Sequence, residues 1–171
     1  EPVDWDPQHI MQPLDNTIIV HIEGREVKVR AWKHVIRGNG DRDIPIFYLD
    51  TNIEGNNEYD RSLTGYLYGG DRHYRLCQEI ILGIGGIRLL DELGYTNIKK
   101  YHMNEGHAAL LGVELLKRTC NGDRHNKACY DIESIREKCV FTTHTPVAAG
   151  HDRFEVEMVR QIMGESMPEF A

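Results

Sequence analysis

The sequence lacks the features of a membrane-spanning or exported chain. It contains no run of about 18 apolar residues, which excludes a transmembrane helix. It begins at Glu1 without a charged and then apolar leader, so we expect no signal peptide. Because the chain also lacks an initiator Met, we expect it to be a piece of a longer protein.

Basic residues are scarce. The chain carries 20 Lys and Arg against 27 Asp and Glu, which gives a formal net charge of −7 with His neutral. Contacts to phosphates need clustered Lys and Arg, and the basic residues here are scattered. The sequence therefore argues against nucleic acid and anionic membranes as partners.

Cysteines are few, and none of them forms a C-x-x-C pair. The four are Cys77, Cys120, Cys129 and Cys139. This pattern predicts buried or idle thiols and no disulfide framework, which is typical of a reducing compartment. We therefore expect a cytoplasmic protein.

The composition that remains is that of an ordinary globular domain. Hydrophobic residues make up 40% and charged residues 27% of the 171 positions. A chain of this length buries roughly 70% of its unfolded surface, enough for a core of its own.

The order of apolar runs predicts an α/β fold. β-Branched runs at 17–20 and 27–31 predict a hairpin. The apolar run 44–49 predicts a strand buried on both faces. The patterns that follow predict helix 71–93, strand 98–103, helices 106–118 and 131–138, strand 139–143 and helix 153–163. This alternation predicts a parallel, Rossmann-like sheet with helices on both faces, plus the antiparallel hairpin. We divide the chain into a lead-in and hairpin (1–43) and a parallel α/β core (44–171).

The predicted helix 71–93 contains three glycines, Gly83, Gly85 and Gly86. Each costs a helix about 1 kcal/mol relative to Ala. The segment lacks the preceding strand and the Lys-Ser/Thr of a phosphate-binding loop, so that interpretation is rejected. We interpret the glycines as positions of close packing between the helix and the sheet.

Polar residues gather where the predicted strands end. The three clusters are Asp50-Thr51-Asn52, Asn104-Glu105-Gly106-His107, and Thr142 to Pro146 followed by Gly150-His151-Asp152. Parallel sheets bind ligands at the carboxyl ends of their strands, and this mixture of groups suits a hydroxyl-rich ligand. The alternative is structural, since Asn104 and Asp71 could serve only as helix caps and His107 only as a structural histidine.

Metal and hydrolase chemistry find less support. The possible ligands are His102, Glu105, His107, His144 and His151. Their spacing is not that of His-Glu-x-x-His on one helical face, so we expect no metal site. No Gly-x-Ser-x-Gly motif is present either, which argues against a serine hydrolase.

Six motifs, in order and in register, resemble the α-glucan (glycogen, starch or maltodextrin) phosphorylases, in particular their shorter prokaryotic branch. They are Leu49-Asp50-Thr51-Asn52, Leu67-Tyr68-Gly69-Gly70-Asp71, Tyr74-Arg75-Leu76-Cys77-Gln78-Glu79, Gly83-Ile84-Gly85-Gly86, His102-Met103-Asn104-Glu105-Gly106-His107 and Phe141-Thr142-Thr143-His144-Thr145-Pro146. The resemblance extends from about Trp5 to Met163.

The resemblance implies a fragment of a larger enzyme. Phosphorylases have two Rossmann-like domains in the glycosyltransferase-B arrangement, and this chain resembles part of the N-terminal one. They cleave α-1,4-glucans with phosphate to α-glucose 1-phosphate, with retention, and are usually homodimers. Their pyridoxal phosphate is held by a Lys of the C-terminal domain, so we expect no cofactor bound here and no activity from the chain alone.

The resemblance also implies roles for individual residues. His144 corresponds to the family histidine that faces the transferred glucosyl residue, so we expect it to be catalytic, and Thr145 follows it toward the glucan. Asn104, Glu105 and His107 correspond to residues beside the sugar subsites. Asp71 is a further substrate-binding candidate, because it falls where longer members of the family have a gate loop.

Two other functions stay open. A glycogen-synthase-like retaining glycosyltransferase would share the fold but use a nucleotide sugar and no pyridoxal phosphate. A non-catalytic carbohydrate-binding domain would need exposed aromatic platforms, and the two tryptophans, Trp5 and Trp32, do not lie at predicted strand ends.

Overall fold

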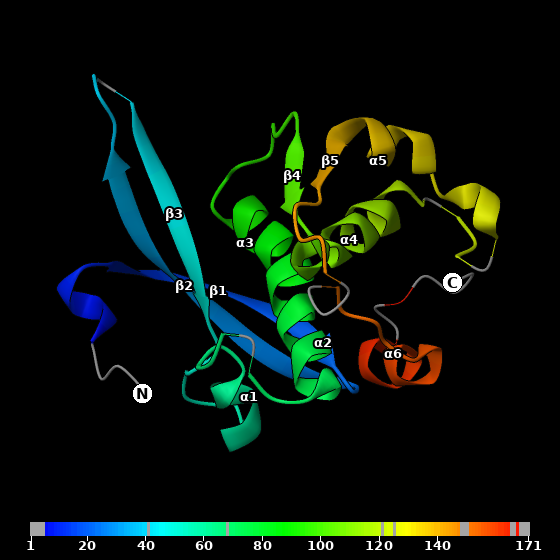
Figure 1. Cartoon of the computed structure of the whole chain (residues 1–171), viewed down its shortest axis with the longest axis horizontal. Helices are drawn as coiled ribbons and strands as arrows, with labels where there is room; N and C mark the ends of the chain where they lie inside the picture. The colour runs from blue at the N-terminus through cyan, green and yellow to red at the C-terminus, as the bar shows by residue number, and fades with distance from the viewer. Residues whose placement is uncertain are drawn as a thin grey trace.

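The structure is a computed structural model, which describes residues 6–40, 42–67, 69–120, 122–124, 126–147, 151–164 and 167. Two separate sheets are present in these ranges, a three-stranded antiparallel one and a two-stranded parallel one. A long helix lies between them, and shorter helices pack around it (Figure 1). The α/β class is confirmed, whereas a single parallel sheet is not found in the described residues.

The antiparallel sheet has the strand order β1 (Gln12–Ile22), β2 (Arg25–Arg37) and β3 (Asp43–Asp50). Glu23 and Gly24 join β1 to β2 with φ values of 52° and 74°. Two consecutive positive φ angles are typical of the tight hairpin turn whose twist matches that of the strands. The predicted hairpin is confirmed, and its strands are longer than expected. Its buried face carries Ile18, Val20, Ile22, Val27, Val29 and Ala31.

Residues 44–49 form a strand, but the prediction that this strand is buried on both faces is wrong. The run lies in β3, which pairs antiparallel with β2 and exposes Ile44 (60%) and Tyr48 (45%). A short continuous apolar run does not by itself distinguish a strand buried on both faces from one at a sheet edge. Pro45 lacks a backbone N–H and is typical of an edge strand. Residues 44–49 therefore belong to the same antiparallel sheet as the hairpin.

The predicted helix 71–93 is confirmed as one continuous helical segment. It comprises α2 (Arg72–Ile80), a π-helical stretch η2 (Ile81–Gly85) and α3 (Gly86–Glu92). Asp71 caps its start by accepting the backbone N–H of Tyr74 at 2.9 Å. Gly94, with φ of 83°, follows its last turn. The buried face of the segment includes Leu76, Cys77, Ile80, Ile81, Ile84, Ile87 and Leu89.

Two of the three glycines allow close packing, as the sequence suggested, but not against the parallel sheet. A Cβ on Gly85 would meet Val20 of β1 at 3.3 Å, and one on Gly83 would meet the backbone N of Leu111 at 2.7 Å. The interpretation of Gly86 is wrong, because a Cβ there would meet nothing within 4 Å. The helix thus lies between the antiparallel sheet on one side and helix α4 (Leu110–Thr119) on the other.

The parallel sheet is formed by β4 (Tyr101–Asn104) and β5 (Cys139–Thr142), paired from Tyr101↔Cys139 to Asn104↔Thr142. Between them run η3 (Gly106–Ala108), α4, η4 (Lys127–Cys129) and α5 (Ile132–Lys138). The predicted strands 98–103 and 139–143 and the helices between them are confirmed with shifted ends. Parallel pairing sets the carboxyl ends of both strands side by side.

The prediction of four free thiols is wrong. Cys120, at the end of α4, and Cys129, in η4, form a disulfide with a Cα–Cα distance of 4.7 Å. The short helix η4 returns the chain to the end of α4, and the spacing of the cysteines in the sequence does not reveal this. Cys77 and Cys139 are outside any disulfide.

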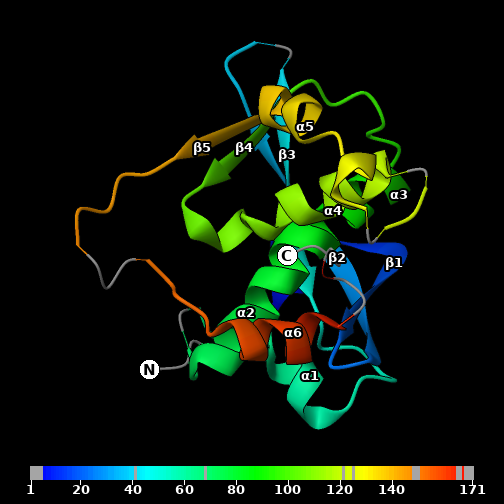
Figure 2. The ribbon, with the colours of Figure 1, turned by 90° about the vertical axis from the view of Figure 1, so that its right-hand side faces the viewer.

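Short helices complete the structure. In α6 (Val156–Met163), the carbonyl of Ile162 accepts the backbone N–H of Glu23 at 2.7 Å, which ties the helix to the β1–β2 turn. Figure 2 shows α6 lying beside α2. Between β3 and α2 lies the short helix α1 (Glu58–Ser62), whose buried Asp60 pairs with Arg25 at 2.8 Å. In the described ranges no helix combines the length and the apolarity needed to cross a bilayer.

Replacing Gly83, which is packed against α4, and Gly86, which has open space beside it, should change the free energy of unfolding in opposite directions. Gly83→Ala would place a Cβ against the backbone of α4, so we expect the free energy of unfolding to fall by about 1–3 kcal/mol. Gly86→Ala meets no neighbour and should raise it by up to about 1 kcal/mol through helix propensity. Urea unfolding of both variants measures the difference. Equal effects of the two substitutions would contradict the packing described here.

Candidate functional site

The ends of β4 and β5 bring two chain segments together. The backbone N–H of Glu105, the residue after β4, donates to the carbonyl of Thr142 at 2.8 Å. Glu105 then turns the chain into η3 with φ of 60° and ψ of −161°, a conformation that residues other than glycine adopt rarely. Such backbone strain is found where the surrounding contacts fix the residue firmly, and it is frequent at functional sites.

The Glu105 carboxylate supplies those contacts. The residue is 5% exposed, and its Oε1 accepts the backbone N–H groups of His144 at 3.0 Å and Thr145 at 2.6 Å. Hydrogen bonds from Thr145 and from the backbone of His144 lower the pKa of Glu105 to about 2. The carboxylate is therefore charged at neutral pH and holds the segment that follows β5 against the end of β4.

The His144 ring is held from both sides. Its Nε2 lies 2.9 Å from Oδ1 of Asn104, and its Nδ1 lies 3.3 Å from Oε1 of Glu105. The side chain nevertheless remains 59% exposed. An imidazole that is oriented by two fixed oxygen atoms and still open on one face is suited to meeting a ligand from outside.

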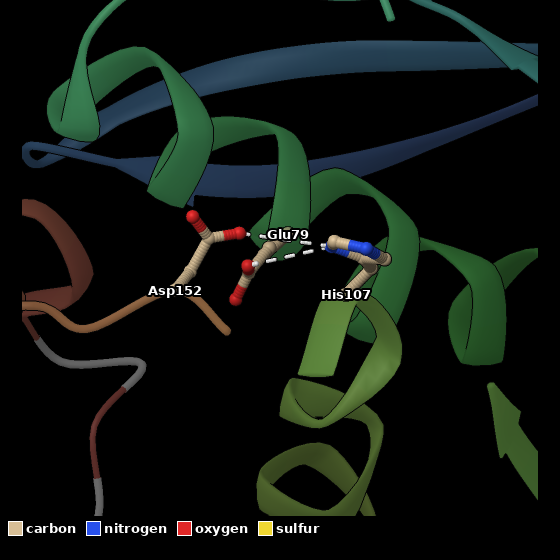
Figure 3. Close-up of side chains that lie close together, drawn as sticks. All are labelled: Glu79, His107 and Asp152. Atoms are coloured by element: carbon tan, nitrogen blue, oxygen red, sulfur yellow. Dashed lines mark ion pairs between the residues drawn. The ribbon is translucent and has the colours of Figure 1, made fainter. Parts of the chain in front are cut away.

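A second polar cluster lies on the helix α2 side. Glu79 and Arg75 of α2, His107 of η3 and Asp152 meet there, and Figure 3 shows Glu79, His107 and Asp152 pointing toward one another. Arg75 pairs with Oδ2 of Asp152 at 2.5 Å, and His107 Nδ1 lies 3.7 Å from the same oxygen. Oε1 of Glu79 lies 4.0 Å from His107 Nδ1.

Glu79 is in an unfavourable setting for a charge. Its side chain is 9% exposed, and its Oε1 has no hydrogen-bond partner among the described residues. Burial, followed by repulsion from Asp152, raises the pKa of Glu79 to about 7. Near neutral pH the carboxyl is therefore divided between its protonated and charged forms.

A cavity of about 400 Å³ adjoins this cluster. Its walls are β3, the segment 63–67, helix α2 and His107. Most of the lining is apolar, and Arg75, Gln78 and Glu79 give one side of it polar groups. This combination of an apolar wall and few polar groups is typical of binding pockets.

Comparison with curated proteins gives clear relatives, although no family model matches the chain. A glycogen phosphorylase of Mycobacterium tuberculosis is 40% identical over 132 residues, which cover 71% of this chain and 14% of that protein. A maltodextrin phosphorylase of Thermococcus litoralis is 37% identical over 144 residues, or 84% of this chain and 16% of that protein. A glycogen phosphorylase of Aquifex aeolicus is 33% identical over 117 residues, which are 68% of this chain and 16% of that protein.

This chain is related to a segment of the α-glucan phosphorylases. It spans only about a sixth or less of the length of these phosphorylases. The resemblance inferred from the six motifs is therefore confirmed.

The structure brings together four of the residues that the phosphorylase resemblance singles out. Asn104, Glu105, His144 and Thr145 form one connected group. His107 instead faces Glu79 and Asp152 in the second cluster. Asp71 serves as the N-cap of α2, and His151 Nε2 lies 3.1 Å from the carbonyl of Thr145. Gly150 lies outside the described residues.

One of the three predicted polar clusters does not belong to this site. Asp50 ends β3 of the antiparallel sheet, where it accepts hydrogen bonds from Arg30 and from Nε1 of Trp32, both at 2.9 Å. Because β3 does not run beside β4 or β5, its end does not contribute to the edge that they form.

The suggested metal ligands do not assemble as one set either. Of His102, Glu105, His107, His144 and His151, His107 alone belongs to a group with metal-ligand spacing in the described ranges. Its companions, Glu79 and Asp152, were not among the suggested ligands. A signal for Glu79 did exist, since Arg75 and Glu79 place two opposite charges four positions apart in a helix.

Glu79 should make stability fall as pH rises. Its folded pKa of about 7 exceeds the ordinary 4.5, so the folded chain binds more protons than the unfolded chain between these values. The free energy of unfolding should therefore decrease across that window, by at most about 3 kcal/mol from this group. Glu79→Gln, which mimics the protonated form, should remove that decrease. Urea unfolding in metal-free buffer from pH 4.5 to 8 tests this, with the exposed Glu133→Gln as control.

Glu105 should make the free energy of unfolding decrease as pH is lowered. Its pKa is lowered to about 2, so its stabilising effect is present above the ordinary 4.5 and is lost as pH falls toward 2. Glu105→Gln should destabilise the chain at pH 7 and have little effect near pH 2. Thermal melts at both pH values measure this, and equal destabilisation at both would show that the charge of Glu105 is unimportant.

Proposed function

We propose that this chain is part of the N-terminal domain of an α-glucan phosphorylase of the glycosyltransferase-B type. The whole protein would cleave α-1,4-glucans with phosphate and release α-glucose 1-phosphate with retention. The observation that carries the proposal is the 37–40% identity to phosphorylases over most of the chain. The connected group of Asn104, Glu105, His144 and Thr145, at the ends of the parallel strands, supports the proposal as the site of glycosyl transfer.

In this proposal His144 faces the sugar that is transferred. Its ring is oriented by Asn104 and Glu105 and remains open to a ligand on one side. A fixed polar group near the anomeric carbon stabilises positive charge that develops in the transition state without having to reorganise. Thr145 would extend the same surface toward the glucan.

We assign Glu105 a positioning role rather than direct contact with glucan. Its Oε1 already accepts two backbone N–H groups from the segment that carries His144. Glu105 would therefore act on the sugar through the position of His144. Asn104, His107 and Asp71 remain candidates for contacts with the glucan. In this structure the Asp71 side chain caps α2.

The cofactor belongs to a part of the protein that this chain does not contain. In the phosphorylases, pyridoxal phosphate supplies the phosphate group that exchanges protons with the substrate phosphate, and the resemblance assigns its Lys to the C-terminal domain. We propose that the whole protein is a cytoplasmic homodimer. The Cys120–Cys129 disulfide is a less common feature in that compartment.

The functional test uses both the chain and a longer protein that carries it. The 171-residue chain, given maltodextrin, phosphate and pyridoxal phosphate, should release no glucose 1-phosphate. In the longer protein, His144→Ala should lower kcat by about 10–1,000-fold with little change in KM, as expected for a contact made mainly in the transition state. His21→Ala, on the exposed side of β1, should leave both constants unchanged.

Two results would contradict the proposal. Turnover by the isolated chain would show that it is not a fragment of the catalytic unit. Unchanged kinetics for His144→Ala would show that the strand ends are not the site of glycosyl transfer.

A further inference from the structure

One oxygen of the buried Glu79 carboxyl group, Oε1, has no hydrogen-bond partner among the described residues. The Glu79 side chain is nine-tenths buried. An unpaired carboxylate away from water is costly, so such groups are usually hydrogen-bonded or bound to a cation. Arg75 of the same helix pairs with Asp152.

Two further ligand atoms lie beside this oxygen. Glu79, His107 and Asp152 each offer one ligand atom, and these three atoms lie within 4.8 Å of one another. His107 Nδ1 is 4.0 Å from Glu79 and 3.7 Å from Asp152. A metal ion with ligands at about 2.1 Å separates those ligands by roughly 3–4 Å, so only small movements would be needed.

The three residues come from separate parts of the fold. Glu79 lies on α2, His107 lies on η3 directly after β4, and Asp152 lies in the segment that leads from β5 to α6 (Figure 3). We propose that Glu79, His107 and Asp152 form a binding site for a divalent transition-metal ion such as Zn²⁺. One imidazole and two carboxylates suit such an ion, whereas Mg²⁺ and Ca²⁺ prefer oxygen ligands alone.

Charge favours a cation at this position. Glu79 and Asp152 carry two negative charges when ionised, and Arg75 supplies one positive charge, so the cluster keeps a formal charge of −1 with His107 neutral. The Arg75 guanidinium lies 2.5 Å from Asp152 and 3.4 Å from His107 Nδ1. Arg75 therefore competes with the metal for the same atoms, and Arg75→Gln should tighten metal binding.

The site has a structural consequence that is independent of glycosyl transfer. A bound ion would connect Asp152 to α2 and to η3. Asp152 follows the residues that Glu105 holds, so the ion would add a second anchor to the same part of the chain. The proposal differs from the expectation of no metal drawn from sequence spacing, and it does not depend on the proposed function.

The test is calorimetric titration of ZnCl₂ into the metal-free 171-residue chain at pH 7.5. We expect saturable binding of one Zn²⁺ per chain and a higher Tm in its presence. Glu79→Gln and His107→Ala should each weaken binding about 10-fold or more. Glu133→Gln and His21→Ala, which change exposed residues outside the cluster, are the matched controls and should bind as the unaltered chain does.

A second measurement requires no substitution. Zn²⁺ should shift the imidazole NMR signals of His107 and leave those of His144 in place, and circular dichroism checks that each variant is folded. The proposal is overturned if the unaltered chain shows no saturable Zn²⁺ binding, which would mean that the Glu79 carboxyl simply holds a proton. It is also overturned if binding survives in folded Glu79→Gln and His107→Ala, or if Zn²⁺ perturbs His144 instead of His107.

Discussion

Close packing around the helical segment from Arg72 to Glu92 is the constraint on which the rest of the structure depends. Gly85 lets the antiparallel sheet approach one side of it, and Gly83 lets α4 approach another. Helix α6 covers a further part of α2. Because β4 leads through η3 directly into α4, the position of α4 against Gly83 also determines where the end of β4 lies. The candidate site is therefore anchored in the core of the domain.

Two polar contacts hold residues that follow β5, namely His144 and Thr145 at one place and Asp152 at another. The charged Glu105 carboxylate holds the backbone of His144 and Thr145. Further along, Asp152 pairs with Arg75 on α2. The two anchors differ in their electrostatics. Glu105 is stabilised in its charged form by backbone donors, whereas Glu79, beside the second anchor, is destabilised in its charged form by burial and by Asp152.

This arrangement gives the two histidines different surroundings. His144 is 59% exposed and is oriented by oxygen atoms on either side, as suits a group that meets substrate. The side chain of His107 is 29% exposed and faces two carboxyl groups and a guanidinium. Their motifs look alike in the sequence, since each follows a short strand in a polar cluster. The neighbours of His107 come from α2 and from Asp152, and these neighbours distinguish it from His144.

The sequence by itself determined the local elements and the family relation. Periodicity predicted the helix 71–93 with its Asp71 cap and the two parallel strands, β4 and β5, whose carboxyl ends carry Glu105 and His144. These features depend on residues close in the chain or on one strand pairing. Tertiary structure alone decided the rest: the antiparallel place of β3, the Cys120–Cys129 bond, the empty space at Gly86 and the convergence of Glu79, His107 and Asp152. Each of these depends on which surfaces meet across many residues, and spacing within a single segment carries no information about that.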